Sequence, residues 1–209
     1  MITANSPGVQ QLGNGATTTE QRITNDGAIV NANGHGRYTE LVYRSGLFHL
    51  SVAGATATVY TGAGAGTPLL AVHNPANSGK NLVLVGLYVA NRVAASAAGT
   101  VTFNLWGGVS VQPTGTQTTP RNLNSLNQAG SVGLGFSNTA LTGSTALNLL
   151  FPVFTYYWAT AAGAFAAPGY FDLGGTVMVA PGNQVAFGAT AALTSATWDV
   201  AMTWEEISI

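Results

Sequence analysis

Residues 198–205 show the clearest pattern of apolar and polar positions in the chain. Large apolar side chains occupy every second position, at Trp198, Val200, Met202 and Trp204. The positions between them hold small or polar side chains, namely Asp199, Ala201, Thr203 and Glu205. Successive side chains of a β-strand point to opposite faces, so this alternation predicts a strand with one face on the core and one polar face.

A second long strand is predicted over residues 81–90. This segment, Asn81–Ala90, reads NLVLVGLYVA and is apolar on both of the faces that a strand would present. Its β-branched residues and Gly86 disfavour a helix, and apolar side chains on both faces are typical of a central strand. The segment Thr100–Trp106 also alternates. We expect it to pair with residues 81–90 through the Ala-, Ser- and Gly-rich loop between them.

Further strands are predicted where short apolar or β-branched runs lie between turn residues. These runs are residues 47–52, 56–60, 69–72, 147–154, 170–173, 176–179 and 184–189. Gly54 is interpreted as the turn between the first two runs. Pro181 and Gly182 occupy the central positions that a type II turn favours, so residues 180–183 are predicted to reverse the chain.

These runs predict an all-β fold with eight or more strands and no convincing helix. Many short strands at close spacing are typical of a sandwich, a jelly roll or a barrel. The length of the segment and its long central strand favour a jelly-roll-like antiparallel β-sandwich over residues 39–209. The strand order cannot be derived from the periodicity alone.

Two stretches do not fit the strand pattern. Residues 1–38 are rich in Gly, Asn, Thr and Gln, and a run such as Ala28-Ile29-Val30 is an exception among them. They are predicted to form an extended N-terminal arm, because they hold too few apolar residues to fold alone. Residues 107–146 are predicted to be an irregular insertion that contacts a neighbouring molecule. The alternative is two weak edge strands joined by long turns.

Composition changes the picture of the surface. Apolar residues make up 46% of the 209 residues, but charged residues only 6%, against roughly 25% in a typical soluble domain. A surface of Ala, Gly, Thr and Asn can be covered by a partner with little desolvation of charge. We therefore expect much of the surface to be covered in the working state. The alternative is a neutral monomer kept in solution by Thr and Asn.

Charge and targeting patterns exclude several classes of partner. The net charge is −1. The six basic residues are scattered along the sequence, namely Arg22, Arg37, Arg44, Lys80, Arg92 and Arg121. Because they form no basic run that could bind along a phosphate backbone, nucleic-acid binding is not expected. The N-terminus lacks the pattern of a secretory signal, and no apolar run is long enough to predict a membrane helix. Synthesis and folding in the cytosol of the producing cell are expected.

No catalytic, cofactor-binding or metal-binding residues are predicted. The chain has no cysteine, which excludes thiolate chemistry and cysteine-ligated zinc. The spacing of His35, His49 and His73 matches no metal motif, so each is interpreted as structural. Asp172 and Asp199 are the remaining pair that could converge as the two carboxylates of a glycosidase, although nothing in their spacing requires it.

Other polar motifs have simpler interpretations. Glu205 and Glu206 point to opposite faces of a strand and are expected to be solvated. Residues 62–67, GAGAGT, lack the Gly-Lys-Ser/Thr ending of a phosphate loop and the helix that follows one. Residues 77–80 contain a Gly-Lys pair but lead into a strand, so Lys80 is expected to be a surface charge at a turn.

Six aromatic residues could in principle form a sugar-stacking platform. They are Trp106, Tyr156, Tyr157, Trp158, Trp198 and Trp204. Aromatic side chains also dominate the cores of β-sandwiches and the centres of oligomer interfaces. We expect most of these six to lie in the core or in an interface.

Several short segments resemble structural proteins of tailed bacteriophages. The stretch Val72–Leu84, VHNPANSGKNLVL, is similar to a turn–strand pattern in those proteins. The same pattern is matched by Gly36-Arg37-Tyr38, Arg44-Ser45-Gly46, Val179-Ala180-Pro181-Gly182 and Thr203-Trp204-Glu205-Glu206-Ile207. Together these segments span residues 36–207, and the stretch 107–146 has no part in the resemblance.

The resemblance implies a non-enzymatic component of a virion. Within that class it implies a capsid cement or decoration protein, a jelly-roll homo-oligomer, most simply a trimer, bound to the major capsid protein at the capsid surface. The low charge and the polar arm suit this role independently. The alternative is a tail-associated or fibre-type receptor-binding module.

Overall fold

A computed structural model describes most of the chain beyond the N-terminal forty residues. The described residues are 8–11, 18–21, 42, 45–124, 130–158, 168–192 and 195–209, with the backbone alone for 8–11, 18–21 and 158. The chain divides into two compact units, Met1–Thr39 and Glu40–Ile209.

In the N-terminal unit the structure describes one antiparallel strand pair. Strand β1 (Gly8–Gln11) pairs with β2 (Thr18–Gln21), with Gly8 opposite Gln21. The other residues of the predicted arm over 1–38, including Ala28-Ile29-Val30, lie outside the described residues.

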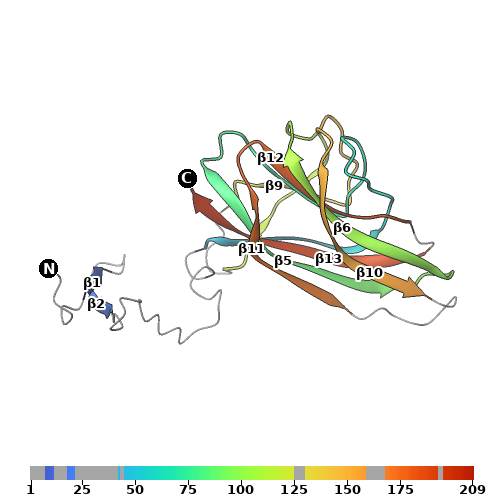
Figure 1. Ribbon diagram of the computed structural model, residues 1–209, viewed down its shortest axis with the longest axis horizontal. Helices are drawn as coiled ribbons and strands as arrows, with labels where there is room; N and C mark the ends of the chain where they lie inside the picture. The colour runs from blue at the N-terminus through green and yellow to red at the C-terminus, as the bar shows by residue number, and fades with distance from the viewer. Residues whose placement is uncertain are drawn as a thin grey trace. The chain divides into compact units, whose positions relative to one another are not determined.

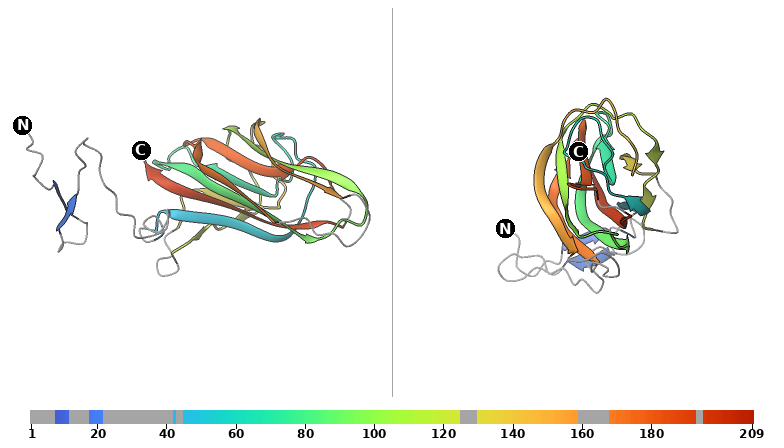
Figure 2. Two further views of the ribbon diagram at one scale, coloured as in Figure 1. Left: turned by 60° about the horizontal axis from the view of Figure 1, so that its bottom comes forward. Right: turned by 90° about the vertical axis from the view of Figure 1, so that its right-hand side faces the viewer.

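The second unit contains two antiparallel sheets that face each other (Figures 1 and 2). The six-stranded sheet has the order β10-β6-β12-β4-β9-β7, and the five-stranded sheet has the order β11-β5-β13-β3-β8. Their bounds are β3 Leu47–Thr56, β4 Leu70–Asn74, β5 Lys80–Val93, β6 Gly99–Val109, β7 Gln117–Thr118, β8 Arg121–Asn122, β9 Leu134–Ser137, β10 Asn148–Trp158, β11 Gly169–Val179, β12 Asn183–Ala189 and β13 Thr197–Ser208.

The connectivity of the eight principal strands is that of a jelly roll. Taken in chain order, the first of them, β3, pairs with the last, β13, and β4 pairs with β12. Strand β5 pairs with β11, and β6 pairs with β10. The chain is therefore a long hairpin rolled into two sheets, which confirms the jelly-roll-like sandwich predicted from the sequence.

Large rings fill the space between the sheets. Trp198 and Trp204 of β13 are fully buried, as are Val200 and Met202, which confirms the predicted core face of the last strand. The Phe103 ring meets the Trp198 ring edge-on, with centroids 4.7 Å apart. Burial of such large apolar side chains supplies most of the driving force for this fold.

A third layer of loops covers the outer face of the six-stranded sheet. Tyr60 from the loop after β3 packs edge-on against Trp106 of β6, with ring centroids 5.1 Å apart. Leu141 and Leu147 join the same buried cluster. Backbone hydrogen bonds link the loops to each other, including a reciprocal pair between Gly66 and Leu141 at 3.1 and 2.8 Å. The sheet is therefore covered by apolar side chains on both faces.

The prediction that residues 81–90 pair with 100–106 is wrong. Strand β5 lies between β11 and β13 in one sheet, whereas β6 lies between β10 and β12 in the other. The short link after Val93 crosses from one sheet to the other, as a jelly roll requires, instead of closing a hairpin. Strand β5 is nonetheless a central strand that is buried along most of its length, as its apolar pattern predicted.

Two predicted chain breaks prove to be bulges within continuous strands. Gly54 does not end a strand: β3 continues to Thr56, with Gly54 at φ +68° opposite a register shift in β13. The two strands predicted at 170–173 and 176–179 are one strand, β11, in which Gly174 and Gly175 adopt positive φ within a bulge between Asp172 and Val177. Glycine adopts these backbone conformations without the penalty that a Cβ would impose.

The stretch 107–146 contains the end of β6 and the short strands β7, β8 and β9. Strands β9 and β7 extend one edge of the six-stranded sheet, and β8 extends one edge of the five-stranded sheet. Other parts of the stretch, including Thr114, Leu141 and Thr142, contribute to the third layer, whereas Ser131 and Val132 contact β13. Residues 125–129 lie outside the described residues. This stretch therefore covers part of the sandwich itself.

The predicted turn between β11 and β12 is present. Asn183 N donates a hydrogen bond to Ala180 O at 3.0 Å, and Gly182 has φ +77°. Pro181 and Gly182 thus occupy the central positions of the turn, as their sequence indicated.

Candidate functional site

The two aspartates that could have formed a glycosidase pair lie far apart. Asp172 of β11 and Thr203 of β13 lie opposite the same residue of β5, Gly86. Asp199 lies four residues from Thr203 along β13, which is about 13 Å at the rise of a strand, with β5 in between. Glycosidase carboxylates stand within about 9.5 Å of each other, so these two do not meet that geometry.

Each aspartate instead supports a local backbone feature. An Asp199 Oδ1 atom accepts a hydrogen bond of 2.8 Å from Gly54 N at the bulge of β3, and lies 3.4 Å from the Arg92 guanidinium. Asp172 Oδ1 accepts a hydrogen bond of 2.8 Å from Gly174 N at the bulge of β11. Both carboxylates therefore satisfy amide groups that the bulges leave without a ladder partner.

The expectation that Glu206 is solvated is wrong. Its side chain is 1% exposed, and Oε2 lies 2.9 Å from Lys80 Nζ. Its Oε1 atom accepts hydrogen bonds from Ser131 Oγ at 2.5 Å and Val132 N at 2.9 Å. Lys80 is accordingly the ion-pair partner of a buried carboxylate and more than a surface charge at a turn. The alternation of side chains along a strand predicted the face of β13 on which Glu206 lies. It could not show that residues 131–132 cover that face.

Glu205 precedes Glu206 on β13, so its side chain points to the opposite face of the strand, where it is half-buried. Desolvation by burial raises its pKa above the ordinary value. The position opposite it on β5 is Val83, which explains the apolar surroundings.

The motif around Asn74 has a structural role that the sequence did not specify. Asn74 is fully buried, and its Nδ2 donates to Lys80 O at 2.7 Å and to Val179 O at 2.8 Å. Ser78 closes the same turn through a hydrogen bond of 3.0 Å from its backbone N to Pro75 O. The pattern from Asn74 to Lys80 thus ties the turn before β5 to the end of β11.

The described histidines are separated and partly or fully buried. His73 is 2% exposed on β4, and His49 is half-buried on β3. Burial lowers the pKa of both, and the nearby Arg121 lowers that of His49 further. His35 lies outside the described residues. Within the described part of the chain, no three His, Asp or Glu side chains gather as a metal would need.

The aromatic residues weighed as a sugar platform are mostly internal. Trp106, Trp198 and Trp204 are buried, and Tyr156 is half-buried against the core, with its ring 5.3 Å from that of Trp198. Tyr157 is 72% exposed, while the side chain of Trp158 lies outside the described residues. The described residues therefore place no tryptophan on a sugar-binding surface.

Charge is distributed unequally between the two sheets. Seven ionisable Lys, Arg, Asp and Glu side chains are described, and all belong to the five-stranded sheet: Lys80, Arg92, Arg121, Asp172, Asp199, Glu205 and Glu206. Four of the seven form two ion pairs with each other, Lys80 with Glu206 and Arg92 with Asp199. The six-stranded sheet and the third layer over it contain no Asp, Glu, Lys or Arg among their described residues.

We call the exposed residues of this half the uncharged surface. Its members on the third layer are small or neutral: Thr58, Val59, Thr61, Ala63, Ala65, Val111, Gln112, Thr114, Thr116, Ala140, Thr142 and Thr145. Val59 is 55% exposed and Val111 is 68% exposed. A surface of this kind loses little solvation energy of charged groups when another protein covers it.

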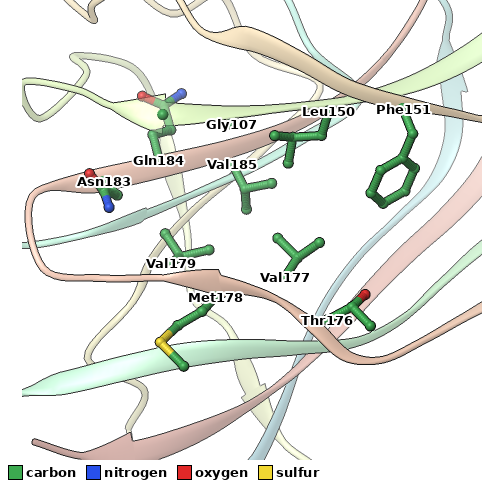
Figure 3. A pocket seen from close by; sticks show the side chains of 11 residues that line it. Gly107, Leu150, Phe151, Thr176, Val177, Met178, Val179, Asn183, Gln184 and Val185 are labelled. Carbon is green, nitrogen blue, oxygen red and sulfur yellow. The ribbon is translucent and has the colours of Figure 1, made fainter.

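A groove opens beside the uncharged surface, between the edge strands of the two sheets (Figure 3). It has a volume of about 460 Å³, and β6, β10, β11 and β12 contribute to its walls. The side chains that point toward its centre are mainly apolar: Leu150, Phe151, Val177, Val179 and Val185. Asn183 and Thr176 supply polar groups, and no ionised residue lines it.

The strands that flank the groove each have one free edge in the described part of the fold. Strand β10 pairs only with β6, and β11 pairs only with β5. Both edges are irregular: β10 contains Pro152 and two register shifts, and β11 contains the bulge at Gly174 and Gly175. Such bulges hinder uncontrolled pairing of long edges, while the straight segments beside them keep unpaired backbone groups.

These observations define a jelly-roll-like β-sandwich in which the described charged side chains all lie on one sheet. No protein-family model, curated protein or solved structure matches the chain. No helix in the described residues is long and apolar enough to span a membrane.

Proposed function

We propose that this protein is a homo-oligomeric structural component of a bacteriophage particle, which cements or decorates the capsid by packing between subunits. In this proposal the major capsid protein is the partner and the capsid surface is the location. The protein has no enzymatic role in it.

The observation that supports this proposal best is the uncharged surface. One sheet and its covering loops carry no ionised side chain among the described residues, while every described charge lies on the other sheet. A monomer in water gains solubility from dispersed charge, so an entire neutral half favours a partner over solvent. Ala, Thr and Val also lose little rotamer entropy when a neighbour covers them.

The jelly roll and the sequence resemblance support the same proposal. Jelly rolls occur in viral capsid proteins, although also in lectins and in cupins, so the fold alone does not select a function. The segments that resemble phage virion proteins include the Asn74–Lys80 turn, which is a structural element here.

The direct test is assembly of the purified full-length chain. We expect sedimentation velocity to show a homo-oligomer, with a trimer as the simplest closed form, and we expect the protein to co-sediment with phage capsid shells. A strictly monomeric protein that leaves the shells unbound would contradict the proposal.

A matched pair of variants locates the surface that assembles. Val111→Lys adds a charge to the uncharged surface, and Ile209→Lys adds the same charge at the end of the five-stranded sheet; their exposed fractions are 68% and 77%. We expect Val111→Lys to reduce oligomer formation or shell binding at least tenfold and Ile209→Lys to change either by less than twofold. Equal effects of the two variants would contradict the assignment of the surface.

The second candidate is the tail-associated receptor-binding module. The exposed Tyr157 supports it, because a tyrosine ring can stack on a sugar. Glycan-array binding that Tyr157→Ala abolishes would favour this candidate over the capsid role.

A further inference from the structure

The outer face of the five-stranded sheet carries two exposed tyrosines on adjacent strands. Tyr88 of β5 and Tyr170 of β11 lie opposite each other in the sheet, and they are 40% and 60% exposed. The residues beside them along the strands, Leu87, Val89 and Phe171, lie in the core or pack against it. Because side chains alternate along a strand, both tyrosines stand on the face that points away from the core.

The backbone at Gly86 determines where the Tyr170 ring lies. A Cβ at Gly86 would be 2.5 Å from the Tyr170 hydroxyl oxygen and 2.8 Å from two of its ring carbons. The ring therefore leans from β11 across the backbone of β5, in space that only a glycine leaves open. Since the ring rests on this backbone and is still 60% exposed, it presents a supported aromatic surface to solvent. A ring that is already held in place loses little conformational entropy when a ligand stacks on it.

Small side chains continue this face beside the tyrosines. Ala201 of β13 lies opposite Tyr88, and Ser51 of β3 lies opposite Ala201. In the neighbouring row, Thr203 of β13 lies opposite Gly86. These short side chains leave the rings as the raised part of the face, so a flat ligand can lie against them and still reach the sheet.

Polar groups suited to hydroxyl ligands lie in that neighbouring row. It runs across four adjacent strands through His49, Thr203, Gly86 and Asp172. Asp172 is exposed, and its Oδ1 accepts a hydrogen bond from Gly174 N. A carboxylate has acceptor sites for several donors, and a threonine hydroxyl both donates and accepts. The face thus combines aromatic rings with groups that can form hydrogen bonds to a ligand rich in hydroxyls.

The charge of this sheet selects an uncharged ligand. Three of its described ionisable side chains are basic and four are acidic, and four of these seven are paired with each other. Neither an anionic nor a cationic polymer finds a large excess of opposite charge there, and no basic stripe follows a phosphate backbone. A neutral oligosaccharide matches the face, because a pyranose ring has C–H groups that stack on an aromatic ring and hydroxyls that bind polar side chains.

We propose that Tyr88 and Tyr170 form a binding platform for neutral glycans, in which sugar rings stack on the two tyrosines and sugar hydroxyls bind Asp172 and Thr203. The outer faces of two packed sheets point in opposite directions, so this platform lies on the other side of the sandwich from the uncharged surface. The inference goes beyond the proposed capsid role: the platform stays open to solvent when a partner covers the uncharged surface.

The test is a glycan array probed with the full-length protein, carrying neutral, sialylated and sulfated oligosaccharides. We expect binding to neutral hexose oligosaccharides, and no gain from sialic acid or sulfate. Tyr88→Ala and Tyr170→Ala should each weaken binding of the strongest array ligand at least tenfold. Tyr170→Phe keeps the ring and should stay within threefold of the wild type. The matched control is Tyr157→Ala, which removes a 72% exposed tyrosine from the other sheet and should change binding less than twofold.

The outcomes separate this inference from the proposed function. Silence of the array with the wild type would overturn the platform, as would Tyr88→Ala and Tyr170→Ala proteins that bind like the wild type. Loss of binding with Tyr157→Ala alone would also overturn it and would favour the receptor-binding candidate instead. Sedimentation of the wild type reports the proposed function: an oligomer without glycan binding removes the platform alone, and a monomer that binds glycans removes the oligomer alone. Urea unfolding of each variant shows that a loss of binding is not a loss of fold.

Discussion

At Glu206 one carboxylate connects three separate segments of the chain. It accepts hydrogen bonds from Lys80 at the start of β5 and from Ser131 and Val132, which precede β9. A carboxylate 1% exposed to solvent is costly to bury, and these three donors offset that cost. The last strand is thereby fixed to two distant parts of the fold.

Replacing this carboxylate should weaken the fold measurably. We expect Glu206→Gln to lower the free energy of unfolding by about 1–3 kcal/mol. The neutral amide loses the ion pair with Lys80, and its NH2 group faces donor groups where the carboxylate had two acceptors. Urea denaturation followed by tryptophan fluorescence measures the change. Glu205→Gln is the matched control, and we expect it to be neutral or slightly stabilising, since burial disfavours the ionised form of Glu205.

The buried histidines predict a loss of stability on mild acidification. Burial lowers the pKa of His73 in the folded protein below its ordinary value of 6.5. At pH values between this lowered pKa and 6.5, the unfolded chain therefore binds more protons than the folded chain. Stability should therefore fall as the pH drops below about 6.5, by at most about 1.4 kcal/mol per pH unit for each histidine. Urea titrations of the wild type and of His73→Gln between pH 7 and pH 5 test this. An equally steep fall in both proteins would contradict the role of His73.

Glu205 acts in the opposite direction at lower pH. Its raised pKa means that the folded protein takes up the proton first, so acidification toward its ordinary value of 4.5 adds stability there. The histidine effect is therefore best measured above pH 5.

At the scale of the strands, the bulge of β3 depends on one glycine. Gly54 has φ +68°, and a Cβ at this position would meet nothing closer than 3.7 Å. We expect Gly54→Ala to destabilise the protein by about 1–2 kcal/mol through backbone strain alone, because its surroundings have room for a methyl group. Urea unfolding is the measurement. Gly130→Ala is the control, since open space surrounds Gly130 and its φ lies outside the left-handed region. A loss as large as that of Gly54→Ala would contradict the strain argument.

The sequence predicted most strands correctly but predicted the breaks between them poorly, and the strand predicted at residues 56–60 is wrong, because residues 57–60 lie in the loop after β3. The alternation from Trp198 to Trp204 located a core strand correctly, because one residue period decides which face is buried. Gly54 was interpreted as a turn, and residues 170–173 and 176–179 as separate strands, although Gly54 and the Gly174-Gly175 pair lie in bulges. A glycine with positive φ is common to turns and bulges, and only the register of the partner strand separates the two.

The uncharged surface was predictable in composition but not in place. The 6% charge predicted a surface with few ionised side chains, whereas the segregation of charge onto one sheet follows from strand order, which pairs residues far apart in the sequence. The pairing of Asn81–Ala90 failed for the same reason: a short link can close a hairpin or cross between sheets. The groove likewise combines residues from four strands and leaves no local pattern.

For the whole molecule, association through a neutral surface predicts weak dependence on salt. Screening acts on charges, and the proposed contact surface has none among its described residues. We expect the association constant from sedimentation to change less than about threefold between 50 and 500 mM NaCl, and to increase with ammonium sulfate, which strengthens apolar contacts. A tenfold weakening by NaCl would indicate an interface that depends on the charged sheet.

The rolled hairpin also imposes an order on biosynthesis. Strand β3 begins at Leu47, but its neighbour β13 begins at Thr197, 150 residues later. At a translation rate of about 5–20 residues per second, the early strand waits roughly 8–30 s for the segment that completes its sheet. During that interval a nascent polypeptide with few charges exposes apolar strands to its surroundings. Its yield in the cell should consequently depend on chaperones that hold unfinished chains, and a chain that ends before β13 should accumulate as aggregate.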